Sequence, residues 1–135
     1  NKKPVKTSST RRIPAFGVRP GLPIGCKVTI RGKKAEELLK RLFEPINNKL
    51  NFKQMNKGSF AFGIKEYIEI PGVVYQRDIG IMGLDVSVTL MRAGFRVKKR
   101  RFWRRIPKRH MITNEETAEF IRKKFNVEVE QNASK

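Results

Sequence analysis

The sequence contains very little cysteine and histidine: Cys26 and His110 are the single examples of each in 135 residues. One cysteine cannot form an intramolecular disulfide, and it cannot supply the thiolates of a cysteine-based zinc site. A lone histidine builds no metal site or proton relay with Cys26 at any recognised spacing. We therefore expect a protein of a reducing compartment without a metal or other cofactor, with His110 as a surface group or a neighbour of phosphate.

Motifs of catalysis and long apolar runs are also missing. No GxxxxGK[ST], GxSxG or HExxH pattern occurs, and no pair of acids has a spacing that requires catalysis. No apolar run approaches the roughly 20 residues that span a bilayer, and the start of the sequence has no hydrophobic signal region. We predict a soluble, intracellular protein that is not an enzyme.

Acidic residues are absent from two long stretches. Residues 1–35 carry ten Lys or Arg before the first acid, Glu36, and residues 86–114 carry ten more without one Asp or Glu. The formal net charge is +19. Such self-repulsion costs stability unless a polyanion neutralises it, and nucleic acid gains further from counterion release. A membrane surface would require a basic amphipathic helix, whereas these cations fall in expected loops and strands, so no membrane partner is predicted.

The apolar spacing predicts an α+β fold. A period of two predicts a half-buried strand over residues 24–30, after an irregular stretch, residues 1–23, that holds four prolines. A period of 3.6 predicts a helix over residues 35–43, closed by Pro45, and Thr113 with Glu116 forms a capping box that opens a second helix. Residues 60–64 and 68–70 are expected as one long strand or two short ones. Residues 86–90 are expected to form a hairpin with a strand that begins at residues 95–97 and runs into residues 98–101. We expect one domain over residues 1–135: an antiparallel β-sheet with two helices packed on one face, a two-layer sandwich from which basic loops and a hairpin extend.

Residues 92–109, the basic segment, contain ten cations in eighteen residues, interleaved with Phe95, Phe102 and Trp103. Cations of this density bind phosphates, and exposed aromatic rings stack on unpaired bases. We predict that the segment binds a polyanion. Trp103 is expected as a buried anchor more than as a stacking platform. The candidate contact residues are Arg96, Lys98, Lys99, Arg100, Arg101, Trp103, Arg104, Arg105, Lys108, Arg109 and His110.

Residues 11–19, the projecting loop, place Ile13, Phe16 and Val18 inside a basic stretch rich in proline and glycine. These apolar side chains either pack inward or press on a partner. The residues themselves leave both interpretations open.

Five runs of residues carry a resemblance to a known family. They are IPAFG at 13–17, PIGCKVT at 23–29, SFAFGIKE at 59–66, GIMGLDV at 80–86 and IPKRH at 106–110. In order and spacing they resemble the large-subunit ribosomal protein that anchors 5S rRNA, the "L five" family of archaeal type. The resemblance covers nearly the whole chain. It implies a structural constituent of the cytoplasmic ribosome, located in the central protuberance, and a helix and strand that precede the present start and are missing here.

The resemblance also implies partners and site residues. Its members hold 5S rRNA through a sheet face, which here would comprise Lys2, Lys6, Lys27, Thr29 and Arg31. Thr29 would bond the 5S backbone, and Lys2 stands where relatives often carry glutamine. The basic segment would be an extension embedded in ribosomal RNA, and large-subunit rRNA is an implied partner. A neighbouring 5S-associated ribosomal protein is a further implied partner.

Two more contacts follow from the resemblance. The projecting loop would reach the peptidyl-site tRNA, with contact residues Arg11, Arg12, Ile13, Phe16 and Arg19. Residues 72–83 would touch a small-subunit head protein across an intersubunit bridge. Without the resemblance, the alternative is a general architectural protein that binds DNA or RNA, but both expected helices expose acids, which repel duplex DNA.

Overall fold

The computed structural model describes residues 2–130, and its chain divides into two compact units, Asn1–Leu38 and Leu39–Lys135. The division falls inside helix α1 (Lys33–Phe43). The fold is α+β, as predicted, with two α-helices and antiparallel sheets in the described residues.

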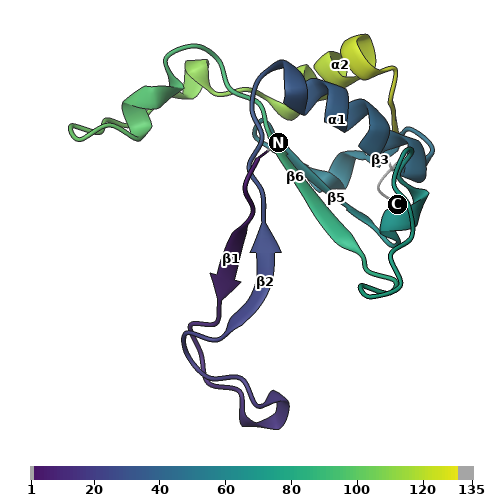
Figure 1. The fold of residues 1–135 in the computed structure, drawn as a ribbon. Coiled ribbons are helices and arrows are strands. Elements are labelled where there is room, and N and C mark those ends of the chain that lie inside the picture. The colour runs from purple at the N-terminus through teal and green to yellow at the C-terminus, as the bar shows by residue number, and fades with distance from the viewer. Residues whose placement is uncertain (1, 131–135) are drawn as a thin grey trace, which may run out of the picture. The chain divides into compact units, whose positions relative to one another are not determined.

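The first unit contains a two-stranded antiparallel ribbon of β1 (Val5–Ser8) and β2 (Pro23–Lys27), shown in Figure 1. The expectation that residues 1–23 hold little strand is wrong at β1. The four residues of β1 are too few for a periodic signal, and β1 gains its ladder from a partner far along the chain.

The strand expected over residues 24–30 is shorter and more exposed than predicted. It ends at Lys27, and every residue of β2 is exposed, including Ile24 at 61%. Alternation fixes which side chains share a face of a strand, but it does not guarantee that another layer covers that face. The half-buried interpretation is therefore wrong here.

The second unit is built on the antiparallel sheet β4-β5-β6: β4 (Met55–Asn56), β5 (Ser59–Ile64) and β6 (Leu84–Thr89). The register pairs Phe60 with Val88 and Phe62 with Val86. The side chains of Phe60, Phe62 and Ile64 are buried, while Ala61 and Gly63 between them are exposed. The strands predicted at 60–64 and 86–90 are thus confirmed.

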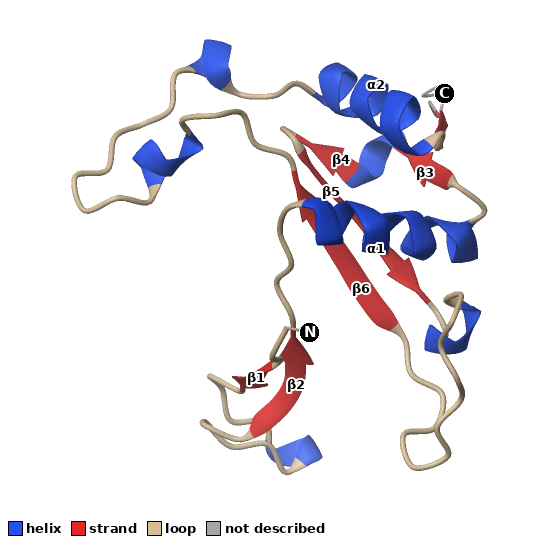
Figure 2. Cartoon of the chain, turned by 45° about the horizontal axis from the view of Figure 1, so that its top comes forward, coloured by secondary structure: helices blue, strands red, loops and turns tan. Residues whose placement is uncertain are grey.

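Both helices cover the buried face of β5. Phe43, at the end of α1, stacks against Phe60 and Phe62, with ring centroids 6.3 and 5.4 Å away. Phe125, at the end of α2 (Asn114–Phe125), meets Phe43 edge-on at 5.4 Å. Figure 2 shows α2 beside β4. The aromatic cluster therefore joins the sheet to both helices.

The ends of the helices match the sequence signals. The Thr113–Glu116 capping box opens α2 as predicted. Pro45 lies just after α1, in a 3₁₀ turn. The second unit also contains a parallel strand pair, formed by β3 (Lys49–Asn51) and β7 (Glu128–Glu130). The 3₁₀ turns are Pro14–Phe16, Glu44–Ile46, Phe52–Gln54, Tyr67–Glu69, Phe95–Lys98 and Lys108–His110.

Two predicted strands are wrong. Residues 68–70 fall in and after the turn Tyr67–Glu69, and the segment expected to pair with β6 in a hairpin instead begins with the turn Phe95–Lys98. The amides of Val97 and Lys99 donate to the carbonyls of Gly94 and Arg96 at 3.2 and 2.9 Å, so this backbone bonds within the turn and not to β6. Gly94 has φ +91°, so the chain turns immediately before Phe95. The basic segment contains no strand among its residues, all of which are described.

Candidate nucleic-acid interface

The projecting loop is an ordered turn. The backbones of Ile13 and Val18 exchange hydrogen bonds of 2.8 and 3.1 Å, and Gly17 takes φ +63° to close the 3₁₀ turn between them. Phe16 is 80% exposed. Within the first unit its ring is therefore displayed at the tip of the turn. The inward-packing interpretation does not hold for Phe16.

Ser9 fixes the neck of this loop. Its buried hydroxyl donates to the Arg11 carbonyl at 2.7 Å, and its amide donates to the Leu22 carbonyl at 2.8 Å. The Ser9 carbonyl in turn accepts from the Gly21 amide at 2.9 Å. The loop therefore leaves the ribbon through a hydrogen-bonded base, which limits how it can swing. Its three arginines, Arg11, Arg12 and Arg19, are all exposed.

The residues expected to face 5S rRNA are all exposed, but the ribbon does not bring them to one face. Lys6 pairs with Cys26 in the ladder, and Lys27 pairs with Val5. Directly paired residues share a face and neighbours along a strand alternate, so Lys6 and Lys27 point to opposite faces. Lys2, Thr29 and Arg31 lie outside the two strands.

The basic segment is fixed at its first residue and within its turns. Arg92 Nη2 lies 2.7 Å from Glu116 Oε1 on α2. His110 Nε2 lies 2.8 Å from the Ala93 carbonyl oxygen, and the Arg104 amide donates to the Val97 carbonyl at 3.2 Å. These contacts connect residues 93–97 to residues 104–110 at two points. The segment is therefore a folded extension.

The cations of this extension face solvent. Arg96, Lys98, Lys99, Arg100, Arg101, Arg104, Arg105, Lys108 and Arg109 are all exposed. Among residues 2–130, no ion pair connects any of these nine to a carboxylate. Their charges are thus available to an external polyanion.

Two aromatic rings accompany these cations at the surface. Trp103 is 72% exposed and Phe102 is 78% exposed. The expectation that Trp103 is a buried anchor is therefore wrong: the aromatic core is filled by phenylalanines of β5 and the helices, and the extension lies beyond it. The Arg101 guanidinium lies 5.8 Å from the Phe102 ring centroid, a cation–π contact.

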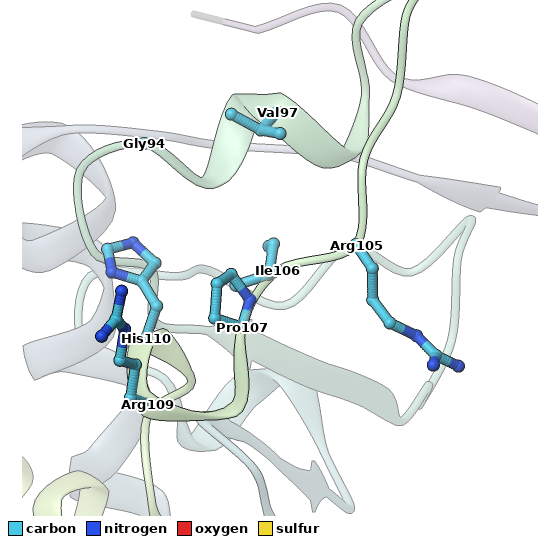
Figure 3. Close-up of a pocket in the computed structure, with 7 residues that line it drawn as sticks. All are labelled: Gly94, Val97, Arg105, Ile106, Pro107, Arg109 and His110. Carbon is cyan, nitrogen blue, oxygen red and sulfur yellow. The ribbon is translucent and has the colours of Figure 1, made fainter.

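A cavity of about 490 Å³ lies within the extension (Figure 3). Gly94, Val97, Arg105, Ile106, Pro107, Arg109 and His110 line it. Sequence reasoning recognised the charges here and missed the cavity, because Val97, Ile106 and Pro107 have no periodic spacing. The IPKRH run at 106–110 was the available signal.

The long loop between β5 and β6 exposes apolar side chains. Val73, Val74, Tyr75, Ile79, Ile81 and Met82 are all at least partly uncovered. The Gln76 amide donates to the Tyr67 hydroxyl at 2.9 Å, and the Tyr67 amide donates to the Met82 carbonyl at 3.0 Å. The loop is therefore held in shape while it displays apolar surface, as a protein contact requires.

Two absences hold for residues 2–130. No three His, Cys, Asp or Glu side chains gather where a metal ion could be bound. None of the helices in this part of the chain has the length and apolarity to cross a membrane.

Comparison with known proteins identifies the family. The profile of the C-terminus of the ribosomal "L five" family matches residues 23–128, and the chain belongs to this family. It is 43% identical to the large ribosomal subunit protein uL5 of Methanosphaera stadtmanae over 132 residues, 96% of this chain and 79% of the relative. It is 47% identical to that of Sulfurisphaera tokodaii over 130 residues, 94% of this chain and 73% of the relative.

The family defines the class of protein. The chain is a structural, non-enzymatic constituent of the large ribosomal subunit, located in the cytoplasmic ribosome, and it resembles archaeal members. The exposed cations of the extension agree with this class, because rRNA is the polyanion that a ribosomal protein meets.

Proposed function

We propose that the protein binds 5S rRNA in the central protuberance of the large subunit. The observation that supports this most is the nine exposed, carboxylate-free cations between Arg96 and Arg109. Lys27, Thr29 and Arg31 add phosphate and hydroxyl contacts near the end of β2. The extension binds rRNA through phosphates, and Trp103 and Phe102 stack on unpaired bases.

The projecting loop contacts the peptidyl-site tRNA. Its turn displays Phe16 between exposed arginines, which suits a partner with phosphates around an apolar or stacked surface. Arg11, Arg12 and Arg19 bind the tRNA backbone, while Ile13 and Phe16 press on its folded elbow. The hydrogen-bonded neck at Ser9 lowers the entropy that the loop loses on contact.

Proteins form the remaining contacts. The apolar loop of residues 72–83 contacts a small-subunit head protein across an intersubunit bridge, because its exposed valines, isoleucines and methionine suit a protein partner better than RNA. A neighbouring 5S-associated ribosomal protein completes the environment.

A salt series of filter binding to 5S rRNA tests the main proposal. With about 6–10 phosphate contacts, affinity should fall about 10³–10⁵-fold between about 50 and 200 mM salt. Random duplex DNA, added as a competitor, should fail to displace 5S rRNA from the protein. The reason is that Glu37, Glu115 and Glu119 on the helices are exposed and repel a duplex. A flat salt response would reject RNA binding. Equal competition by duplex DNA would favour the alternative, a general nucleic-acid architectural protein.

A further inference from the structure

Two hydrogen bonds join the two stretches of the basic segment that line the cavity. At one end, His110 reaches the carbonyl of Ala93 at 2.8 Å, and at the other, the Arg104 amide reaches the carbonyl of Val97 at 3.2 Å. The two backbone stretches between these ties form the walls. A Cβ atom built on Gly94 would lie 3.7 Å from His110 Nε2, an ordinary van der Waals contact, so the two residues adjoin at this end. The cavity is therefore part of the fold of the extension.

The walls and the rim differ in chemistry. Val97, Ile106 and Pro107 present apolar surface to the interior, as Figure 3 shows. Arg105 and Arg109 carry positive charge, with the Arg105 side chain extending away from the other lining residues and Arg109 lying beside His110 in Figure 3, and none of the lining residues is acidic. A volume of about 490 Å³ lies within the range of sites for small organic groups, about 300–1,000 Å³. The cavity thus suits a flat, weakly polar group that is attached to an anion.

His110 adds one directed polar group. A carbonyl oxygen can only accept, so His110 Nε2 carries the hydrogen that bonds Ala93. In the neutral ring this leaves Nδ1 as an acceptor, with no partner among the described residues. An acceptor beside an apolar wall can bond an exocyclic amino group or a ring N–H of a nucleobase.

We propose that this cavity receives one unpaired nucleobase of ribosomal RNA, with its sugar–phosphate held by Arg105 and Arg109. The inference rests on the proposed RNA binding and gives it a defined subsite. The base enters between Val97 and Ile106 and is read by His110. Unpaired bases that leave the helical stack are the parts of RNA that proteins recognise individually.

The charge around the cavity favours this occupant over a protein side chain. Residues 86–114 contain ten cations and no acid, so an approaching protein surface would need a dense set of carboxylates. A free anion alone would leave the apolar walls of Val97, Ile106 and Pro107 unused. A nucleotide can place its base against these apolar walls and its phosphate against Arg105 and Arg109.

Two single-stranded probes of equal charge test the subsite: a short oligoadenylate and a ribose–phosphate oligomer of the same length without bases. The full chain should bind the oligoadenylate about tenfold more tightly, the magnitude of holding one base. Val97→Trp should fill the cavity and lower this preference, leaving the part that stacking on Trp103 and Phe102 supplies and an unchanged salt dependence. Ile106→Trp fills it from the opposite wall. Val74→Trp, on the exposed loop of residues 72–83, is the matched control and should keep the preference.

The outcomes separate this subsite from the general proposal. Equal binding of the two probes by the unaltered chain, or a preference that neither filling variant lowers, overturns the subsite. A preference lost in Trp103→Ala and kept in Val97→Trp assigns base recognition to surface stacking and also overturns it. Salt-dependent binding of 5S rRNA is measured alongside, and its loss would instead reject the proposed function. Circular dichroism of each variant verifies that the second unit remains folded.

Discussion

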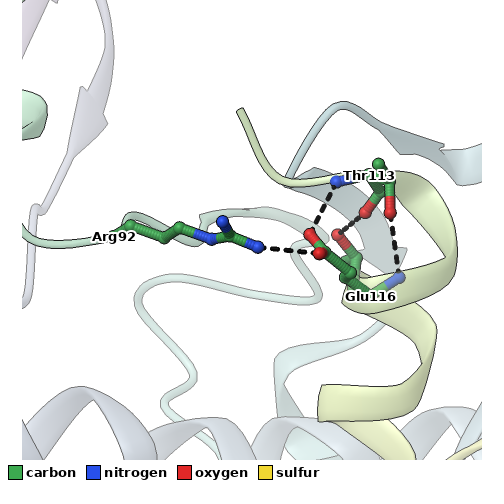
Figure 4. Close-up of polar contacts among 4 residues, drawn as sticks. Arg92, Thr113 and Glu116 are labelled. Atoms are coloured by element: carbon green, nitrogen blue, oxygen red, sulfur yellow. Dashed lines mark hydrogen bonds and ion pairs between the residues drawn. The ribbon is translucent and has the colours of Figure 1, made fainter. Parts of the chain in front are cut away.

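The guanidinium of Arg92 and the carboxylate of Glu116 lie 2.7 Å apart, and this ion pair joins the first residue of the basic segment to the first turn of α2 (Figure 4). Glu116 Oε2 also accepts from the Thr113 amide at 3.1 Å, and the Thr113 hydroxyl accepts from the Glu116 amide at 3.3 Å. One carboxylate therefore caps the helix and holds the base of the extension.

Removing the cap should destabilise the protein more than removing the ion pair. Thr113→Ala loses the hydroxyl that satisfies a helix N–H, which costs about 1 kcal/mol. Arg92→Gln loses an ion pair whose side chains are 44% and 46% exposed, which is worth at most about 1 kcal/mol and often less. Urea unfolding of both variants measures the difference. Equal losses, or a larger loss for Arg92→Gln, would contradict this division of roles.

Removing a phenylalanine ring should lower the free energy of unfolding strongly in the aromatic core and hardly at all in the projecting loop. Phe43 is 1% exposed and contacts Phe60, Phe62 and Phe125, so Phe43→Ala should lower the free energy of unfolding by about 3–5 kcal/mol. Phe16→Ala removes an exposed ring of the same size and should change it by less than about 0.5 kcal/mol. Denaturant titration gives both values. A large loss from Phe16→Ala would mean that this ring packs on the protein and is not displayed to a partner.

Local patterns predicted the elements whose signals lie within a few residues. The helix that ends at Phe43 has a clear 3.6 period and a closing proline, and the Thr113–Glu116 box fixes the start of α2. Phe60, Phe62 and Ile64 alternate and lie on the buried face of β5. These signals depend only on side-chain periodicity and on capping hydrogen bonds, so the sequence carries them directly.

The features that were missed depend on distant residues. β1 forms because Val5–Ser8 pairs with β2, about twenty residues on, and the segment after Gly94 forms a turn whose amides bond within it and not to β6. The cavity requires the ties from Ala93 to His110 and from Val97 to Arg104. The cations of the candidate interface were visible in the sequence, whereas the exposure of Trp103 was not.

Position, and not net charge alone, should determine RNA affinity. Lys98→Gln with Lys99→Gln removes two cations from the extension, whereas Lys40→Gln with Lys123→Gln removes the same charge from helices. The first variant should reduce the slope of log affinity against log salt by up to about 2, since each phosphate contact contributes about 0.9. The second should leave the slope nearly unchanged. Filter binding to 5S rRNA measures both, and identical slopes would show that only the overall charge matters.

The end of β2 should combine two kinds of RNA contact that one experiment can separate. Thr29 and Lys27 are both exposed, and Lys27 has no ion pair among the described residues. Thr29→Val removes one hydroxyl at constant charge and should weaken 5S rRNA binding by about tenfold at every salt concentration, the value of a hydrogen bond to a charged group. Lys27→Gln should instead lower the salt slope by about 1. Thr10→Val, which makes the same change beside the projecting loop, is the control and should bind 5S rRNA normally. If Thr29→Val binds as tightly as the unaltered chain while Lys27→Gln loses slope, the surface holds RNA by charge alone, and the specific role of Thr29 is rejected.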